Sequence, residues 1–254
     1  MKRFGRPVAY EPTPWLRGPA RFRNDYFELD LRRAEEYQPY EHRGQVFEFA
    51  ELKTPAQALR FIERYGLLWA GPGAQEHRES WGDWLREIRT MNVVLDLAAT
   101  VRWAHQGKRE ALDRLQEYGP RLSEFFEAPA STTDELLAQA STFVAWVVSE
   151  GLDGVEQRVS TAVLWEWQPG TSGPPGTWLF VVRAPHLLAY LYHDLAMLLV
   201  QRAPYEQCPE CRRFFPRRDA RQRFCSDQCA DRHRYRRWLQ RHGGRRPKRP
   251  ATDP

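Results

Sequence analysis

The sequence lacks the patterns that mark secretion, membrane insertion and the commonest enzyme chemistries. Its first residues are basic, but no apolar run of about seven or more residues follows them, as a secretion signal requires. Apolar runs such as residues 143–148 and 195–200 are far too short to span a bilayer. No Gly-rich phosphate loop, nucleophile elbow or His-Glu-x-x-His motif occurs. We therefore expect a cytoplasmic protein that is not an enzyme and binds no membrane.

Cysteine is scarce, and its few copies are clustered. All four cysteines lie within 22 residues, as the pairs Cys208-x-x-Cys211 and Cys225-x-x-x-Cys229 with thirteen residues between them. Two such pairs can converge on one metal ion, and four thiolates suit a closed tetrahedral Zn²⁺ site. Clustered cysteines in a cytosolic chain indicate metal ligands before disulfides. The alternatives are buried or redox-paired thiols, or His233 as a replacement ligand.

Lysine is nearly absent from the basic C-terminal part of the chain. Residues 204–254 carry fifteen Lys and Arg against six Asp and Glu, a net charge of +9, and Lys248 is their only lysine. Residues 1–203 carry 23 basic against 27 acidic side chains, a net charge of −4. This asymmetry indicates an anionic partner for the C-terminal part. The alternatives are a solvated basic face or a surface that docks on the acidic body.

The arginines near the cysteines are the candidate nucleic-acid-binding residues, because a guanidinium donates two hydrogen bonds to one phosphate. Six follow the first cysteine pair and five lie on a helix predicted over residues 227–242: Arg212, Arg213, Arg217, Arg218, Arg221 and Arg223, then Arg232, Arg234, Arg236, Arg237 and Arg241. Such a helix can present its arginines to DNA or RNA. Residues 245–249 are expected to add salt-sensitive affinity as a flexible tail.

The pattern of apolar residues predicts a mainly α fold with a small β-hairpin (α+β). Steps of three and four predict helices over residues 54–65, 76–106, 133–150 and 185–202, and one or two helices over residues 108–127. Alternation predicts strands at residues 27–31 and 46–49, and a hairpin built from residues 159–167 and 178–182.

A metal-held module is expected around the cysteines. Residues 212–216 and 222–224 are predicted as two strands, and Ser226 as the cap of a helix that carries Cys229 in its first turn. The positive end of that helix would stabilise thiolates. Phe214, Phe215 and Phe224 are expected to form a small core. The order of knuckle, hairpin and helix is a treble-clef-like arrangement, and metal binding should supply on the order of 10 kcal/mol to its folding.

Four parts follow from these patterns. They are an extended N-terminal arm (residues 1–24), a helical domain (25–203), a zinc-finger module with four cysteine ligands (204–243) and a basic flexible tail (244–254). Trp81, Trp84 and Trp103, on the helix predicted over residues 76–106, are expected in the core. The alternative is a ligand pocket for a small-molecule effector, lined by Trp81, Trp84, Trp103, Trp146, Trp165 and Trp178.

The C-terminal region resembles the CGNR zinc-finger family of bacterial proteins. The resemblance covers about 30 residues: Cys208-x-x-Cys211, Phe214-Phe215, the Arg-rich turn, Arg223-Phe224-Cys225-Ser226 and Cys229-x-x-Arg232. The preceding order of elements is similar to that of the family's helical ABATE domain. Where the family has Cys-Gly-Asn-Arg, this chain has Cys229-Ala230-Asp231-Arg232.

The resemblance implies a transcription regulator that binds DNA through its zinc module. The alternative function is a zinc-dependent protein-interaction module with no direct role in nucleic-acid binding. An enzyme in the helical domain has no supporting motif.

Overall fold

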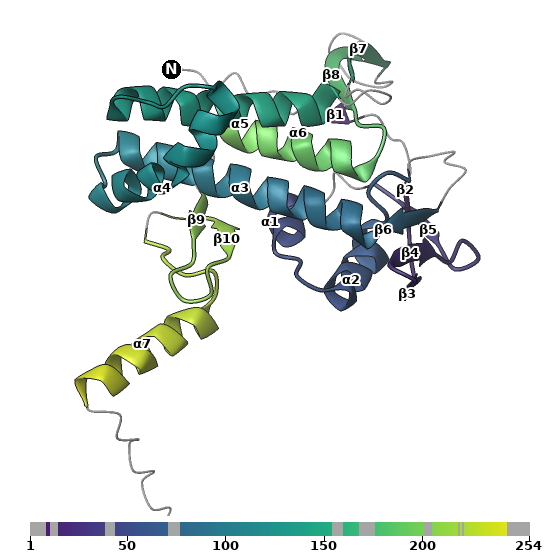
Figure 1. Cartoon of the computed structure of the whole chain (residues 1–254). Helices are drawn as coiled ribbons and strands as arrows, with labels where there is room; N and C mark the ends of the chain where they lie inside the picture. The colour runs from purple at the N-terminus through teal and green to yellow at the C-terminus, as the bar shows by residue number, and fades with distance from the viewer. Residues whose placement is uncertain are drawn as a thin grey trace, which may run out of the picture. The chain divides into compact units, whose positions relative to one another are not determined.

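The chain divides into two compact units, Met1–Arg202 and Ala203–Pro254 (Figure 1). The computed structural model describes residues 9–10, 15–38, 44–70, 77–153, 160–167, 176–200, 205–217, 219 and 221–242. The described elements are mainly helical with small β-sheets, which confirms the predicted mixture of α and β structure. None of the helices in these ranges is long and apolar enough to cross a membrane.

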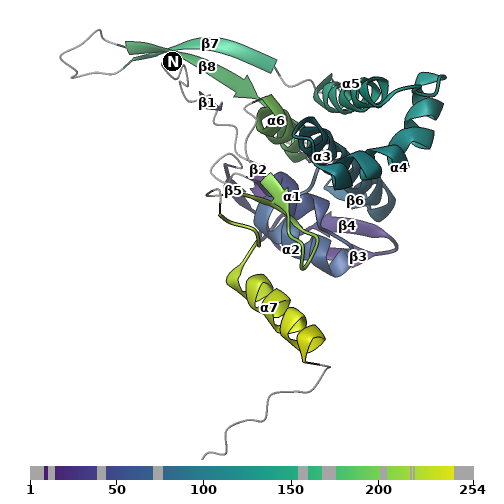
Figure 2. The same ribbon diagram turned by 90° about the vertical axis from the view of Figure 1, so that its left-hand side faces the viewer.

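The first unit is organised around helix α3 (Trp81–His105). This helix contacts α4 (Arg109–Phe126), α5 (Thr133–Asp153) and α1 (Gln45–Ala50), while α6 (Leu187–Val200) contacts both α5 and α1 (Figure 2). Trp84, Met91 and Leu95 of α3 are fully buried, as expected for the central helix of a core. Burial of these side chains provides the main driving force for assembly of this unit.

Small sheets complete the first unit. The described strands form a sheet of order β3-β4-β6, a pair β2-β5 and a sheet of order β1-β8-β7. Their bounds are β1 (Ala9–Tyr10), β2 (Trp15–Arg17), β3 (Ala20–Arg23), β4 (Tyr26–Leu29), β5 (Glu35–Tyr37), β6 (Arg78–Ser80), β7 (Ser160–Trp167) and β8 (Gly176–Arg183). β7 and β8 are antiparallel with Val163 opposite Phe180, so the predicted hairpin is confirmed.

The predicted strand at residues 46–49 is wrong, because these residues belong to helix α1. Val46, Phe49 and Ala50 are all buried, at the steps of three and four that one face of a helix presents to a core. The alternation of Val46-Phe47-Glu48-Phe49 suggested a strand, but so short an apolar run fits either structure. The strand predicted at residues 27–31 is present as β4, which ends at Leu29, and Leu31 is exposed.

Several elements begin or end at other residues than predicted. The helix predicted from residue 76 begins at Trp81, because Ser80 ends strand β6 and its hydroxyl accepts a hydrogen bond from the Asp83 N–H at 3.1 Å. Residues 109–126 form one helix that contains Pro120. Residues 15–17 and 20–23, predicted to lie in an extended arm, form strands paired with β5 and β4. The Thr54 cap of α2 (Pro55–Tyr65) is confirmed.

Glu79 on strand β6 holds the segment that follows α2. Its carboxylate is buried and accepts hydrogen bonds from the backbone N–H groups of Leu68, Trp69 and Ala70, at 2.8, 2.6 and 3.2 Å. It also accepts one from the indole N–H of Trp84 at 2.7 Å. A single carboxylate therefore satisfies three backbone donors of a buried segment and anchors it to the core.

Gly151 was predicted to end its helix, yet α5 continues through it to Asp153. The residue is needed there for its lack of a side chain: a Cβ at this position would lie 2.2–2.4 Å from ring atoms of Tyr192 on α6. The glycine thus allows the Tyr192 ring to lie directly against the backbone of α5.

We expect Gly151→Ala to lower the free energy of unfolding by about 2 kcal/mol, because the Tyr192 ring must move. Gly82→Ala, on α3, is the matched control. A Cβ there meets only the Ser80 hydroxyl at 3.7 Å, so the gain in helix propensity should stabilise the protein by up to about 1 kcal/mol. Urea denaturation of both variants measures the two effects, and equal effects of the same sign would contradict this packing.

Candidate metal centre

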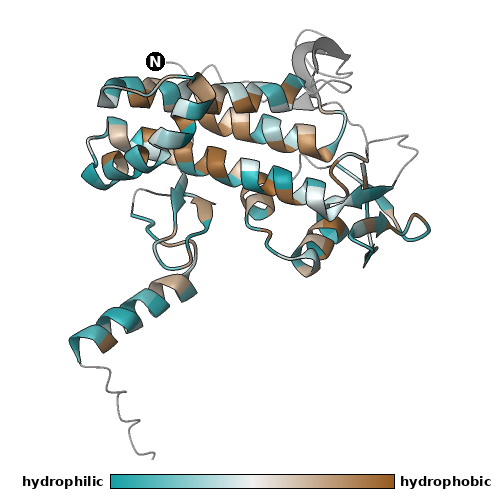
Figure 3. Ribbon diagram, in the orientation of Figure 1, coloured by the Kyte–Doolittle hydropathy of each residue, from teal (hydrophilic) through white to brown (hydrophobic). Residues whose placement is uncertain are grey.

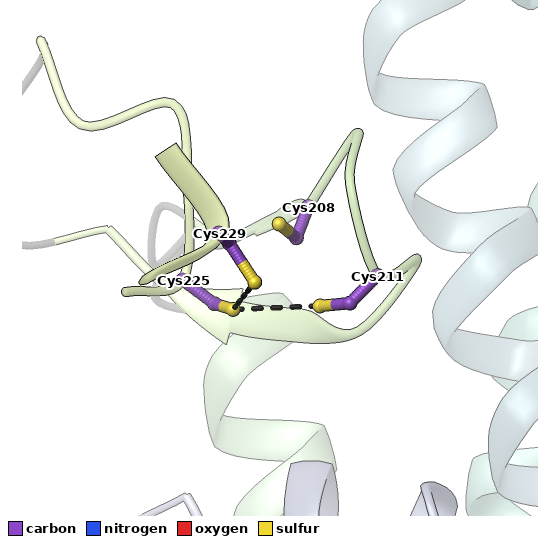
Figure 4. A group of neighbouring side chains, drawn as sticks. All are labelled: Cys208, Cys211, Cys225 and Cys229. Carbon is purple, nitrogen blue, oxygen red and sulfur yellow. Dashed lines mark hydrogen bonds between the residues drawn. The ribbon is translucent and has the colours of Figure 1, made fainter. Parts of the chain in front are cut away.

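The structure brings all four cysteines together (Figure 4). Their sulfur atoms lie within 4.8 Å of one another, with Cys211 and Cys225 at 3.5 Å and Cys225 and Cys229 at 3.6 Å. A disulfide requires about 2.05 Å between sulfur atoms, so these are free thiols at a wider spacing. Tetrahedral Zn²⁺ with bonds of about 2.3 Å places its sulfur ligands about 3.8 Å apart. The cluster therefore fits a four-coordinate metal ion.

The electrostatics of the sulfur atoms also favour a cation. Burial opposes ionisation of Cys208, but N–H groups of Cys225, Cys211 and Glu210 outweigh it and lower the pKa of this thiol to about 7. Burial raises the pKa of Cys211, and burial together with neighbouring sulfur atoms raises the pKa of Cys225. A metal ion supplies the positive charge that such crowded thiolates need, so metal binding and loss of thiol protons are coupled.

The first cysteine pair lies in the turn of a hairpin. Strand β9 (Tyr205–Gln207) pairs with β10 (Phe214–Pro216), with Phe215 opposite Glu206. The Cys208 N–H donates to the Arg213 carbonyl and the Arg212 N–H to the Cys208 carbonyl, both at 2.8 Å. Arg212 has a φ of 63°, the left-handed conformation that so tight a turn requires. These bonds point both sulfur atoms to the same side.

The predicted strand at residues 222–224 is wrong, because the partner of β10 is β9, on the other side of the cysteine pair. Residues 221 and 222 instead lie in a turn held by Asp219, whose carboxylate accepts hydrogen bonds from their N–H groups at 2.7 and 3.0 Å. Asp commonly stabilises turns in this way. Residues 221–224 therefore lead to Cys225 without forming a strand.

The second cysteine pair lies at the start of helix α7 (Asp227–Arg241), as predicted. Ser226 is the N-cap, and its hydroxyl accepts a hydrogen bond from the Cys229 N–H at 3.3 Å. The cap fixes the first turn of the helix and, with it, the direction of the Cys229 side chain. A metal bound here would therefore fix the first turn of α7 to the β9–β10 hairpin.

The core of this unit is small and contains the cysteines themselves. Phe215 packs with Cys208 and Cys229, and Phe224 lies against the same cluster. Phe214 is also buried but contacts the ring of Tyr205, with centroids 6.1 Å apart. Three aromatic side chains provide little burial for independent folding, which supports metal binding as the stabilising term.

Glu210, between the first two cysteines, is a structural contact that sequence reasoning missed. Its side chain is only 3% exposed, and its carboxylate lies 3.1 Å from the guanidinium of Arg236 and 3.8 Å from the ring of His233. Both partners are on α7, so Glu210 ties the cysteine hairpin to the middle of this helix. The local sequence shows only an acidic residue in a cysteine pair, and the pairing depends on the tertiary fold.

His233 stays apart from the sulfur cluster. Its ring packs on Phe224, with centroids 5.1 Å apart, and faces Glu210. The group of potential ligands found among the described residues consists of the four cysteines alone. The structure thus favours the four-cysteine set over the alternative in which His233 replaces one ligand.

The candidate arginines occupy different environments. Arg217 pairs with Glu206 at 3.0 Å and is only partly exposed, and Arg236 pairs with Glu210. Arg218 lies outside the described residues. The remaining eight candidates are exposed: Arg212, Arg213, Arg221, Arg223, Arg232, Arg234, Arg237 and Arg241.

A hollow of about 950 Å³ runs along one face of α7. Arg234, Arg237 and Arg241 line it together with Ala230, at steps of four, three and four along the helix. Arg223 and Phe224 reach it from the preceding loop. Figure 3 shows that α7 is hydrophilic over most of its length. Four arginines from two segments therefore line a common hollow on this unit. We call these four residues, Arg223, Arg234, Arg237 and Arg241, the arginine face.

Aromatic rings adjoin the arginines on α7. Tyr235 stacks on Trp238 with an interplanar angle of 9°, and Trp238 stacks on His242 at 16°. Tyr235 is 45% exposed. Tyr235 and Trp238 line the same hollow as the arginines.

Comparisons of the chain with protein-family models, curated proteins and solved structures found no match.

Proposed function

We propose that this protein binds Zn²⁺ through Cys208, Cys211, Cys225 and Cys229 and binds duplex DNA through the arginines of α7, as a transcription regulator. The observation that carries the proposal is the capped first turn of α7. There a metal ligand starts the same helix that carries the arginine face. The metal would act as a clamp on the direction of that helix and would take no part in chemistry, since four protein ligands leave no open position.

The charge and geometry of α7 suit phosphate. Arg234, Arg237 and Arg241 repeat along one face of the helix, and Arg223 joins them from the loop. A row of guanidinium groups can follow a nucleic-acid backbone, where each neutralised phosphate releases counterions. The knuckle, hairpin and helix order supports a treble-clef-like module, and the resemblance to CGNR zinc fingers supports the assignment to DNA and to regulation.

Asp231 competes with phosphate for Arg234, one of the residues of the arginine face. Its carboxylate pairs with Arg234, and it stands where the family that the chain resembles has asparagine. The two side chains are well exposed, so this ion pair is weak and can be replaced by a phosphate. The departure from the family pattern is thus expected to weaken DNA binding without abolishing it.

Substitution of Arg234, Arg237 and Arg241 together by glutamine should weaken DNA binding and its salt dependence. We expect the slope of log K against log salt concentration to become shallower by about 0.9 for each phosphate that the variant no longer neutralises. Asp231→Asn should act in the opposite direction and tighten binding by about threefold at low salt. Fluorescence anisotropy of the zinc-loaded full chain with random duplex DNA measures both changes.

Arg212→Gln is the matched control for single substitutions of Arg234, Arg237 or Arg241, because it removes one positive charge from an exposed site in the same unit but outside the hollow. Arg212→Gln should weaken DNA binding less than any single substitution in the arginine face. Equal losses from all positions would mean that net charge alone carries the binding. Absence of binding by the unmodified protein at low salt would refute the proposal and favour the protein-interaction module.

A further inference from the structure

The first unit contains a cavity that the proposed DNA binding does not use. Its volume of about 830 Å³ lies within the range typical of small-molecule sites, about 300–1,000 Å³. The cavity is lined by α3, α5 and α6, which lie side by side in Figures 1 and 2, and by the segment after α2. Four aromatic side chains form much of its wall: Trp69, Phe143, Trp146 and Tyr192. Of the six tryptophans named in the predicted pocket, the described lining includes Trp146 alone.

Glu87 places a carboxylate on this aromatic wall. Its Oε2 atom accepts a hydrogen bond from the Tyr192 hydroxyl at 2.9 Å. On its own helix, Arg86 favours the ionised form of Glu87 and Asp83 opposes it, and the Arg86 guanidinium lies 2.6 Å from the Asp83 carboxylate. Arg89 is exposed and lines the same cavity. Burial raises the pKa of Glu87. Among the described residues, no basic side chain forms an ion pair with this carboxylate.

The lining holds one basic side chain, the exposed Arg89, against two acidic ones, Glu87 and Glu150. His186 is half-buried, and this desolvation lowers its pKa to about 4; its Nδ1 atom accepts a hydrogen bond from the Ala189 N–H. It is therefore neutral at physiological pH. Glu150, on α5, is a second acidic group of the lining and is exposed. The lining thus combines aromatic rings and a neutral histidine with two carboxylates and one guanidinium, so its acidic groups outnumber its basic one.

Part of the aromatic wall is open to solvent. Trp146 is 46% exposed although its neighbours in sequence include the buried Val144 and Val147. Its ring lies 4.8 Å from that of Phe125 and 6.3 Å from that of Phe143, between ring centroids. An exposed aromatic cluster beside a cavity is typical of a ligand site, because the ligand covers apolar surface that otherwise faces water.

We propose that this cavity binds an organic ammonium compound, with Glu87 as its counter-ion and the aromatic rings around its body. A protonated amine can form an ion pair with Glu87, which no basic side chain of the described residues does, and can also lie over a tryptophan face. A carboxylate ligand would meet Glu87 and Glu150 as like charges. A neutral ligand of the same shape would gain only the apolar contacts. The site therefore discriminates by head-group charge.

Three aromatic probes of similar size test this discrimination: phenethylamine, phenethyl alcohol and phenylacetate. Binding to the zinc-loaded full chain is measured by isothermal titration calorimetry and by the shift in thermal unfolding. The amine should bind at least about tenfold more tightly than the alcohol, and phenylacetate should bind most weakly. Equal affinity of amine and alcohol, or no binding of any probe at millimolar concentration, would overturn the proposal.

Variants locate the binding in the cavity. Glu87→Gln should abolish the preference for the amine, whereas Glu117→Gln, which removes the same charge from the exposed face of α4, should preserve it. Trp146→Ala changes an exposed side chain, so it should fold normally and weaken binding of the amine and the alcohol alike. Unchanged amine affinity in both Glu87→Gln and Trp146→Ala would contradict the site. These measurements involve no nucleic acid, so their outcome is independent of the DNA-binding proposal.

Discussion

Substitution of Cys208 by serine should abolish stable metal binding and unfold the cysteine module, including the first turns of α7. The fully buried Cys208 lies at the turn of the β9–β10 hairpin, and its sulfur atom is within 4.8 Å of the other three. Loss of one thiolate leaves an incomplete ligand set, and metal binding contributes on the order of 10 kcal/mol to the folding of such modules. The residual core of Phe215 and Phe224 is too small to replace this contribution.

Zinc content and trypsin cleavage measure this effect together. Trypsin cuts after arginine, and α7 carries five of them, so cleavage there reports unfolding of the helix. Ser226→Ala is the control within the same turn: it should cost about 1 kcal/mol through loss of the cap and retain the metal. If Cys208→Ser kept both its zinc and the protection of α7, the cysteines would not form the structural centre described here.

Substitution of Glu79 by alanine should be the most destabilising change in the first unit. It removes the acceptor for three backbone N–H groups and the Trp84 indole, all in buried or partly buried positions. Each unsatisfied buried donor costs about 1–3 kcal/mol, although water entering the space recovers part of this. We therefore expect a loss of about 4 kcal/mol in the free energy of unfolding, measured by urea denaturation followed by far-ultraviolet circular dichroism.

Two comparisons separate this effect from a simple change of charge. Glu79→Gln keeps the size of the side chain but points an amide NH2 group at N–H donors, so it should still cost about 2 kcal/mol. Glu63→Ala removes a glutamate from the exposed face of α2 and should change stability by less than about 0.5 kcal/mol. A loss for Glu79→Ala no larger than that for Glu63→Ala would contradict the anchoring role of this carboxylate.

Local signals were sufficient for the parts of the fold that depend on neighbouring residues. Thr54 and Pro55 mark the start of α2, and Ser226 marks the start of α7, because capping involves side chains and backbone within one turn. The cysteine spacing likewise identified the cluster, since few arrangements of two close pairs serve another purpose. The alternation of residues 159–167 and the apolar, β-prone run at residues 178–182 predicted the hairpin that β7 and β8 form.

Features that depend on partners distant in sequence could not be predicted. The β9–β10 hairpin encloses the first cysteine pair, but a three-residue strand before Cys208 has no pattern of its own. Glu210 and Glu79 are ordinary acidic residues in the sequence, and their roles arise from α7 and from residues 68–70. The cavity is assembled from helices far apart in the chain, so neither its lining nor the burial of Glu87 leaves a local signal.

The dependence of DNA binding on zinc tests whether the metal fixes the helix that carries the arginine face. The full chain is titrated with duplex DNA at several salt concentrations in three states: zinc-loaded, stripped with a chelator, and reloaded with Zn²⁺. We expect salt-sensitive binding whose affinity falls on removal of the metal and recovers on reloading, because the metal fixes the position of α7. Binding with the same affinity and salt dependence in all three states, or no binding in any of them, would contradict it.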